Sequence, residues 1–183
     1  DSTPLRVCRN QRIHIHKVFK GIAQRGKCSL GWFFGFKLHL ICNEKGELLN
    51  FMITPGDVDD RRPLEYKAFV EFIYGKLVGD RGYISKNLFE RLFIDGIQLI
   101  TKLKSNMKGA LMSVSDKLLL RKRAIIETIN DELKNIAQVE HSRHRCFDNF
   151  IVNMLGALAA YCCFPKKPCI NIERTIDTQL KLF

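Results

Sequence analysis

The stretch WFFGFKLHLIC, which runs from Trp32 to Cys42, has large apolar residues at every second position. These residues are Phe34, Phe36, Leu38 and Leu40. Successive side chains of a strand point to opposite faces of a sheet, so this period predicts a strand with one buried face. The turn sequence NEKGEL and a second apolar run, LLNFMIT, follow it. Together the two runs predict an antiparallel hairpin.

The residues after the hairpin predict alternating helices and strands. TPGDVDDRRPLEYKAFVEFIYG indicates a loop, a helix cap at Asp59 or Asp60, and a helix with apolar residues at helical spacing as far as Ile73. KLVGD predicts a short strand, KNLFERLFIDG a helix capped by Ser85, and IQLITKL another strand. A basic stretch and further helices follow. Because parallel neighbours in a sheet need crossover connections, this order predicts an α/β fold with a mixed β-sheet flanked by α-helices.

Length and charge limit what the chain can be. With 183 residues and 46% hydrophobic content, it is long enough for one domain with a core. We expect this core in residues 1–164 and a C-terminal tail in residues 165–183. The formal net charge is +11, and the excess of basic residues concentrates in residues 1–27 and 101–123. Such blocks attract polyanions such as nucleic acids, and a solvated basic face is the alternative interpretation.

The cysteines and histidines do not indicate a disulfide framework or a zinc site. The seven cysteines are odd in number and form no C-x-x-C pair, which favours a reducing cytosol. His141, His144 and Cys146 lie close together in HSRHRC, but the flanking arginines favour a basic patch over zinc. The longest apolar segment, from Phe150 to Phe164, is shorter than the ~20 residues of a membrane span. We therefore expect a soluble, cytoplasmic protein.

Three carboxylates stand out because separate predicted elements carry them. Asp80 ends the predicted strand KLVGD, Glu127 lies on the predicted helix RKRAIIETINDELK, and Asp1 begins a stretch that reads as the end of another strand. Arg123 and Lys134 lie within about 40° of Glu127 around that helix. The alternatives are a turn for Asp80 and an exposed row of ion pairs for Glu127. Acids gathered from separate elements repel one another unless cations offset their charge, and carboxylate oxygens suit Mg²⁺ or Mn²⁺.

The segments DSTPL and GDRGY and the helix pattern R-x3-E-x6-K resemble the catalytic core of bacterial insertion-sequence transposases of the DDE class. TPGDVDDRRPL, ETINDELK and RHRCFDNFIVNMLGALAAY resemble the same family, so the likeness covers nearly the whole chain. It implies an RNase H-like fold in which Asp1, Asp80 and Glu127 form the catalytic, metal-binding triad for two Mg²⁺ or Mn²⁺ ions. Leu120 departs from the pattern, because the family has a tyrosine there. Asp131, one turn after Glu127, is the alternative third carboxylate.

The same resemblance implies DNA transposition. Water would cut a phosphodiester at the end of the element, and the freed 3′-hydroxyl would attack target DNA in the same site. The expected DNA-binding residues are Arg123, Lys134, Arg121, Lys122, Lys102 and Lys104. Pairing two DNA ends favours a homodimer, and the DNA substrate favours association with the nucleoid.

The position of Asp1 bears on whether the chain is active. If Asp1 ends the first strand, that strand is truncated in this chain. An α-amino group has an ordinary pKa of about 7.7–8.0, so its positive charge would compete with metal for the Asp1 carboxylate. The alternatives to an active transposase are therefore a non-catalytic DNA-binding or interfering fragment, and an RNase H-like nuclease or resolvase.

Overall fold

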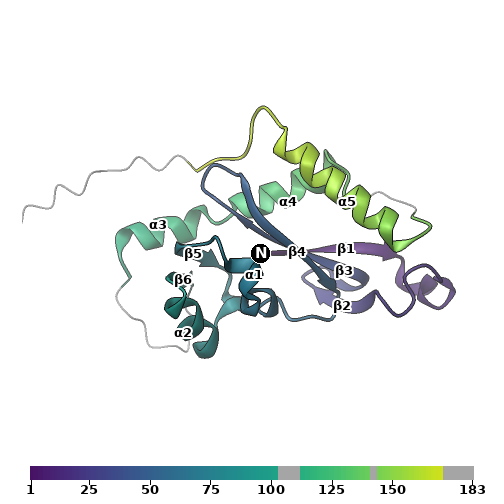
Figure 1. Ribbon diagram of the computed structural model, residues 1–183, viewed down its shortest axis with the longest axis horizontal. Coiled ribbons are helices and arrows are strands. Elements are labelled where there is room, and N and C mark those ends of the chain that lie inside the picture. Colours follow the sequence, from purple (N-terminus) through teal and green to yellow (C-terminus); the bar gives the residue numbers. More distant parts are fainter. Residues whose placement is uncertain (103–111, 141–143, 171–183) are drawn as a thin grey trace, which may run out of the picture.

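The computed structural model describes residues 1–102, 112–140 and 144–170 (Figure 1). Its strands are β1 (Ser2–Cys8), β2 (Gln24–Cys28), β3 (Gly31–Cys42), β4 (Leu48–Pro55), β5 (Gly75–Gly79) and β6 (Ile97–Thr101). Its α-helices are α1 (Lys67–Val70), α2 (Lys86–Ile94), α3 (Val114–Lys122), α4 (Ile125–Asn135) and α5 (Phe147–Cys162). Short 3₁₀ helices span Asn10–Ile15, Arg62–Glu65 and Arg81–Tyr83.

β3 is the centre of a four-stranded antiparallel sheet. β1 pairs with one of its edges, where Thr3 lies opposite Leu38. β4 pairs with the other edge along the second half of β3, where Ile53 lies opposite the same Leu38. β2 pairs with that other edge along the first half. The structure therefore confirms the hairpin predicted from the alternation of apolar residues in β3. The prediction of a single buried face is wrong, because Phe33, His39 and Ile41 on the other face are also buried.

β5 and β6 form a separate, parallel pair. The chain is thus α/β, as expected, but the single mixed sheet of the sequence prediction is divided into two sheets. Figure 1 shows the amino end of the chain in the middle of the molecule, between the β5–β6 pair and the four-stranded sheet. On its edge of β3, the pairing of β1 extends to Leu40, where the backbones of Asp1 and Leu40 exchange hydrogen bonds.

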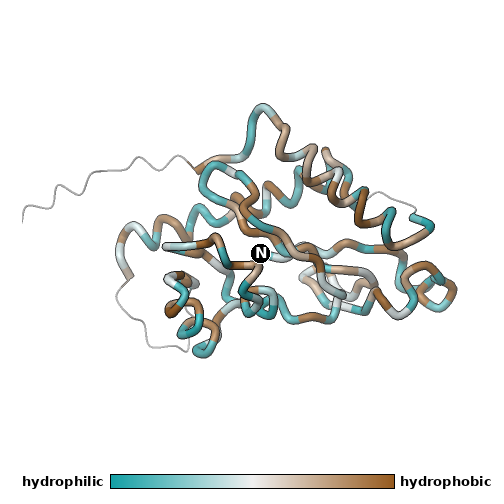
Figure 2. Tube along the Cα trace, viewed as in Figure 1, coloured by the Kyte–Doolittle hydropathy of each residue, from teal (hydrophilic) through white to brown (hydrophobic). Residues whose placement is uncertain are grey.

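Two clusters of buried apolar side chains form the core. The first lies between the four-stranded sheet and helices α4 and α5; its most deeply buried members are Leu38, Ile129, Leu133, Val139 and Tyr161. The second joins Leu92 of α2 and Ile97 of β6 to Ile41 of β3. Apolar residues recur along α5, which covers the first cluster (Figure 2). Within the described ranges, no helix combines the length and the apolar character that a membrane crossing requires.

The helix predicted from Asp60 to Ile73 is wrong in its extent, because the structure divides it into a 3₁₀ helix, Arg62–Glu65, and α1. Tyr66 between them is extended, with φ −84° and ψ 118°. The Asn50 side chain of β4 donates hydrogen bonds to the carbonyls of Ala68 and Phe69, at 3.3 and 3.1 Å. Those carbonyls are the acceptors that a longer helix would have used for its own N–H groups.

One of the two predicted helix caps is also wrong. The carboxylate of Asp59 accepts a hydrogen bond from the Arg61 N–H within the preceding turn, and neither Asp59 nor Asp60 caps a helix. The predicted cap of α2 is confirmed, since the Ser85 hydroxyl accepts from the Leu88 N–H at 3.4 Å.

Candidate active site

Asp80 follows directly on β5 and begins the 3₁₀ turn Arg81–Tyr83. Its Oδ1 accepts a hydrogen bond from the Arg81 N–H at 2.6 Å, so the carboxylate does cap a turn. The same oxygen lies 3.3 Å from Nη1 of Arg123. The side chain remains 55% exposed, so its turn role leaves it accessible for chemistry.

Arg123 connects two of the three predicted carboxylates. Its Nη2 lies 3.7 Å from Oε1 of Glu127, in the first turn of α4, while Nη1 contacts Asp80. The sequence predicted one helix carrying both residues, but α3 ends at Lys122 and α4 begins at Ile125, so Arg123 lies at the junction. The junction keeps Arg123 four residues before Glu127 and turns its guanidinium toward the end of β5.

The structure corrects the predicted position of Asp1. This residue lies at the start of β1, before Ser2, and not at the end of a strand. Its Oδ1 accepts a hydrogen bond from the Ser2 N–H at 2.9 Å, and its α-amino group donates to the Leu40 carbonyl at 3.0 Å. Burial lowers the pKa of this amine to about 6, although Cys42 and Asp60 act in the opposite direction. The lowered pKa reduces the positive charge that was expected beside the Asp1 carboxylate.

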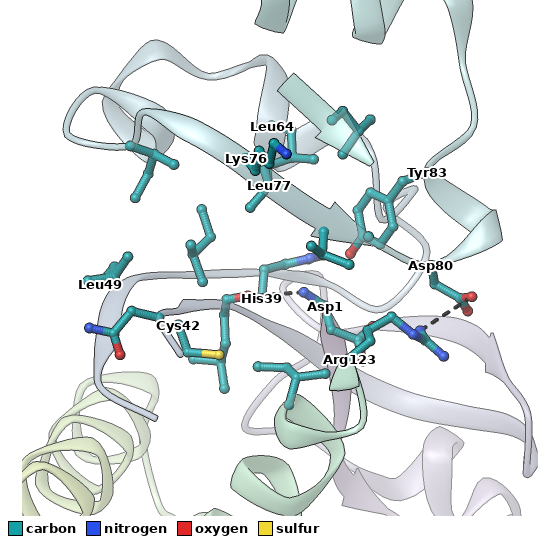
Figure 3. Close-up of a pocket in the computed structure, with 18 of the residues that line it drawn as sticks. Asp1, His39, Cys42, Leu49, Leu64, Lys76, Leu77, Asp80, Tyr83 and Arg123 are labelled. Atoms are coloured by element: carbon teal, nitrogen blue, oxygen red, sulfur yellow. Dashed lines mark hydrogen bonds and ion pairs between the residues drawn. The ribbon is translucent and has the colours of Figure 1, made fainter. Parts of the chain in front are cut away.

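Asp1, Asp80 and Arg123 lie together beside a cavity of about 480 Å³ (Figure 3). We call this cavity the Asp1 groove; its walls include residues 39–44, residues 76–80 and the start of α4. Glu127 is outside the groove wall and reaches the group through Arg123. Asp1 and Asp80 therefore both line the groove, and Glu127 is connected to Asp80 through the Arg123 guanidinium.

The donors at this end have the chemistry of a site for a hard cation. All three are carboxylates, which suit Mg²⁺ or Mn²⁺, and a guanidinium cation already bridges two of them. They do not form a closed metal cluster in this arrangement: among the described residues, no three histidine, cysteine, aspartate or glutamate side chains are grouped closely enough to hold an ion. His141 of the HSRHRC segment lies outside the described residues.

The predicted DNA-binding residues differ in exposure and in their contacts. Arg121 and Lys102 are exposed and Lys122 is half-buried, while Lys104 lies outside the described residues. Lys134 is turned toward β1, where its Nζ donates to the Pro4 carbonyl at 2.8 Å, and it also lies 3.4 Å from a Glu140 oxygen. Those contacts fasten α4 to β1 and leave Lys134 away from the Asp80 end.

Leu120 and Asp131, which the sequence analysis also singled out, lie apart from the contacts of Arg123. Leu120, at the position of the family's tyrosine, is buried near the end of α3 and is 6% exposed. Asp131 is exposed and accepts a hydrogen bond from Asn135 at 2.6 Å, within its own helix. This hydrogen bond directs Asp131 along its own helix, and no contact among the described residues joins it to the group around Arg123.

The sequence prediction missed two polar residues of the groove wall, Asp60 and His39. Lys37 Nζ lies 2.9 Å from Asp60 Oδ1. His39 is 2% exposed, and its Nε2 is 2.8 Å from the Thr54 hydroxyl. Burial lowers the pKa of His39 to about 4, with Asp60 acting in the opposite direction. The cluster of aspartates in TPGDVDD could have indicated that Asp60 lines a site, but the same residues also fit a helix cap.

Comparison with known proteins identifies the family. A family model described as a transposase DDE domain matches residues 1–147 of the 183. No curated protein and no solved structure matches the chain. The match spans β1, the end of β5 and α4, the elements on which Asp1, Asp80 and Glu127 lie. The chain therefore belongs to the transposase DDE domain family.

Proposed function

We propose that the chain is the catalytic domain of a DNA transposase, with an RNase H-like arrangement of its sheet, and that Asp1, Asp80 and Glu127 are its metal ligands. The observation that carries this proposal is the position of Arg123. Its guanidinium joins the carboxylate at the end of β5 to the carboxylate at the start of α4. The family match supports transposition as the overall activity.

Mg²⁺ or Mn²⁺ would be held by the three carboxylates, and two such ions, when bound, offset charge on the attacking and leaving oxygens of a phosphodiester. Arg123 holds Asp80 and Glu127 close together in the absence of metal, because two carboxylates near one another repel unless a cation lies between them. If metal held these carboxylates, the Arg123 guanidinium would be available to bind a DNA phosphate, for which its planar fork is suited.

The remaining residues have supporting roles in this proposal. The Arg81 N–H fixes one oxygen of Asp80 and so orients the carboxylate at the end of the strand. We propose that the DNA backbone is bound by the exposed Arg121 and Lys102 and by Lys122 and Lys104. Lys134 instead positions α4 against β1 through Pro4 and Glu140, and we assign it no phosphate contact.

A second candidate function is a non-catalytic DNA-binding fragment of a transposase. It is favoured by the absence of a closed metal cluster among the described residues. The two candidates differ in their response to metal: binding of DNA in EDTA with no cleavage in Mn²⁺ or Mg²⁺ supports the fragment, whereas metal-dependent cleavage supports the transposase.

Joining of DNA ends separates a transposase from a nuclease or resolvase that shares the metal chemistry. The substrate is a linear duplex with free 3′-hydroxyl ends, incubated with supercoiled plasmid, protein and Mn²⁺. Covalent insertion of the duplex into the plasmid is the expected product. Nicked plasmid without joined product would contradict the transposase assignment and favour a nuclease.

A further inference from the structure

Trp32, the one tryptophan of the chain, is exposed at the start of β3. Its exposed fraction is 57%, although the two residues that follow it, Phe33 and Phe34, are both buried. A single exposed aromatic residue is common on protein surfaces and by itself indicates no site. The residues around Trp32 are what distinguish it, because they are cations from two different strands.

Lys27 and Arg25 lie on the β2 side of Trp32. Lys27 is directly opposite Trp32 in the antiparallel pair of β2 and β3, and its Nζ is 6.0 Å from the centroid of the indole ring. Arg25 lies two residues earlier on the same strand, so its side chain points to the same face about 7 Å away. Both cations are exposed. The Lys27 ammonium is at the outer limit of a cation–π contact, which leaves most of the indole uncovered.

Arg9 and Arg6 lie on the β1 side of Trp32, and both are exposed. The chain leaves β1 at Cys8, and the Asn10 side chain then donates a hydrogen bond to the Trp32 carbonyl at 2.9 Å. That bond holds the segment after β1 beside the start of β3. Arg6, Arg9 and Trp32 consequently line one cavity of about 380 Å³. The indole thus has cations on both sides.

We call this group the Trp32 surface; it consists of Trp32, Lys27, Arg25, Arg9 and Arg6. Within the described ranges, none of its four cations forms an ion pair with a carboxylate. Glu140 also lines the cavity, but its oxygens lie 2.8 Å from the backbone nitrogen of Arg6 and 3.4 Å from Lys134 Nζ. The surface therefore keeps its positive charge, which attracts polyanions.

We propose that the Trp32 surface binds a single-stranded segment of DNA, with one base stacked on the indole and the neighbouring phosphates bound by the four cations. An aromatic side chain among cations is the arrangement by which proteins hold single strands without reading their sequence. A duplex fits less well, because its paired bases are stacked on one another and leave no free face for the indole. The proposal rests on the proposed function only in taking DNA as the polyanion.

The Trp32 surface is separate from the candidate active site. Trp32 lies eight residues before Leu40, which bonds to Asp1, so these two positions on β3 are about 26 Å apart. Figure 1 shows β2 at the end of the four-stranded sheet that is farther from the β5–β6 pair. The surface is therefore a DNA contact remote from the three carboxylates, and its substitutions should leave their positions unchanged.

Tryptophan fluorescence of the full chain reports directly on Trp32, since the chain has no other tryptophan. The chain is titrated in EDTA with an oligothymidylate of eight nucleotides, with an abasic oligomer of the same length, and with a blunt duplex. The oligothymidylate is expected to quench the fluorescence by about half or more, because its base stacks on the indole. The abasic oligomer and the duplex should bind through phosphates with little quenching. Equal quenching by either of them, or none by the oligothymidylate, would overturn the proposal.

Anisotropy of a labelled oligothymidylate gives the affinities of variants. Trp32→Ala should weaken binding about fivefold or more, as for loss of one stacked base, and should leave binding of the abasic oligomer unchanged. Phe93→Ala is the matched control, because Phe93 is an exposed aromatic residue on α2. Lys27→Gln should reduce the slope of log K against log salt by about 0.7, the value for one phosphate contact on a single strand. Equal affinities of Trp32→Ala and Phe93→Ala would overturn the proposal, as would an unchanged slope for Lys27→Gln.

The test is independent of catalysis, because Asp80→Asn should retain the quenching while losing metal-dependent nicking. Quenching by a wild-type chain that does not nick DNA would support the Trp32 surface and contradict the proposed function. Nicking by a wild-type chain that shows no quenching would overturn the Trp32 surface and leave the proposed function in place.

Discussion

The guanidinium of Arg123 lies 3.3 Å from the carboxylate of Asp80, and this ion pair connects the helical half of the candidate site to the end of β5. The partners are 25% and 55% exposed, so the pair contributes no more than about 1 kcal/mol to stability. The pair matters because it fixes the position of Asp80 relative to Glu127, which contacts the same arginine. Under the proposed function, a metal ion would compete with Arg123 for the same carboxylates.

Arg123→Gln is therefore expected to tighten Mn²⁺ binding severalfold in the absence of DNA, because it removes the cation that competes for Asp80 and Glu127. Isothermal titration of the two proteins with MnCl₂ measures the effect. Arg121→Gln is the matched control, since it removes the same charge two residues away at an exposed position. Equal changes in both variants would show that only net charge matters, and weaker binding by Arg123→Gln would contradict the competition.

The third carboxylate can be tested separately. Glu127→Gln should reduce metal-dependent DNA cleavage by at least about a hundredfold, as expected for loss of charge at a metal ligand. Asp131→Asn should leave cleavage unchanged, because Asp131 bonds only within its own helix in the described structure. The measurement is the initial rate of plasmid nicking in Mn²⁺. The opposite ranking of the two variants would move the third ligand to Asp131.

The burial of His39 predicts that the stability of the folded chain depends on pH. Burial lowers its pKa to about 4 in the folded chain from the ordinary 6.5. Below pH 6.5 the unfolded chain therefore binds a proton that the folded chain does not, and stability falls as the pH decreases from 6.5 toward 4. The slope from this one residue is at most about 1.4 kcal/mol per pH unit.

His39→Gln should flatten the pH dependence in that window relative to the wild type, as measured by urea unfolding at pH 7, 6, 5 and 4.5. Glutamine keeps a polar atom near the Thr54 hydroxyl, which bonds His39 in the wild type. His14→Gln is the control at an exposed position. Parallel curves for His39→Gln and the wild type would exclude His39 as the source of the slope.

The basic residues make a prediction about salt dependence. Arg121→Ala and Lys102→Ala should each weaken DNA binding about equally for all sequences. Each should also reduce the slope of log K against log salt by about 0.9, the value for one phosphate contact on duplex DNA. Fluorescence anisotropy between 50 and 200 mM NaCl gives the slope. A slope identical to that of the wild type would identify these residues as a solvated face.

Local features of the fold were predictable where the determining residues lie close in sequence. Alternation of Phe36 and Leu38 with polar neighbours predicted β3, and the Ser85 cap predicted the start of α2. Asp80 was placed correctly at the end of β5 because the apolar run before it is short and a turn follows.

The features that were missed depend on contacts between distant residues. Asn50 of β4 ends α1 through two backbone carbonyls, and no pattern within residues 60–74 encodes that contact. The position of Asp1 at the start of β1 depends on its pairing with Leu40, and the direction of Lys134 depends on Pro4. In each case the partner lies on another element and far away in sequence.

The central claim is that the carboxylate of Asp80 acts in metal-dependent cleavage of DNA. Plasmid nicking in Mn²⁺ tests it most directly, with the wild type compared with Asp80→Asn and with Asp95→Asn, an exposed aspartate at the end of α2. We predict that the wild type and Asp95→Asn nick the plasmid, that EDTA stops both, and that Asp80→Asn binds DNA but does not nick it. Nicking by Asp80→Asn at the wild-type rate would contradict the claim, as would DNA binding without nicking by the wild type.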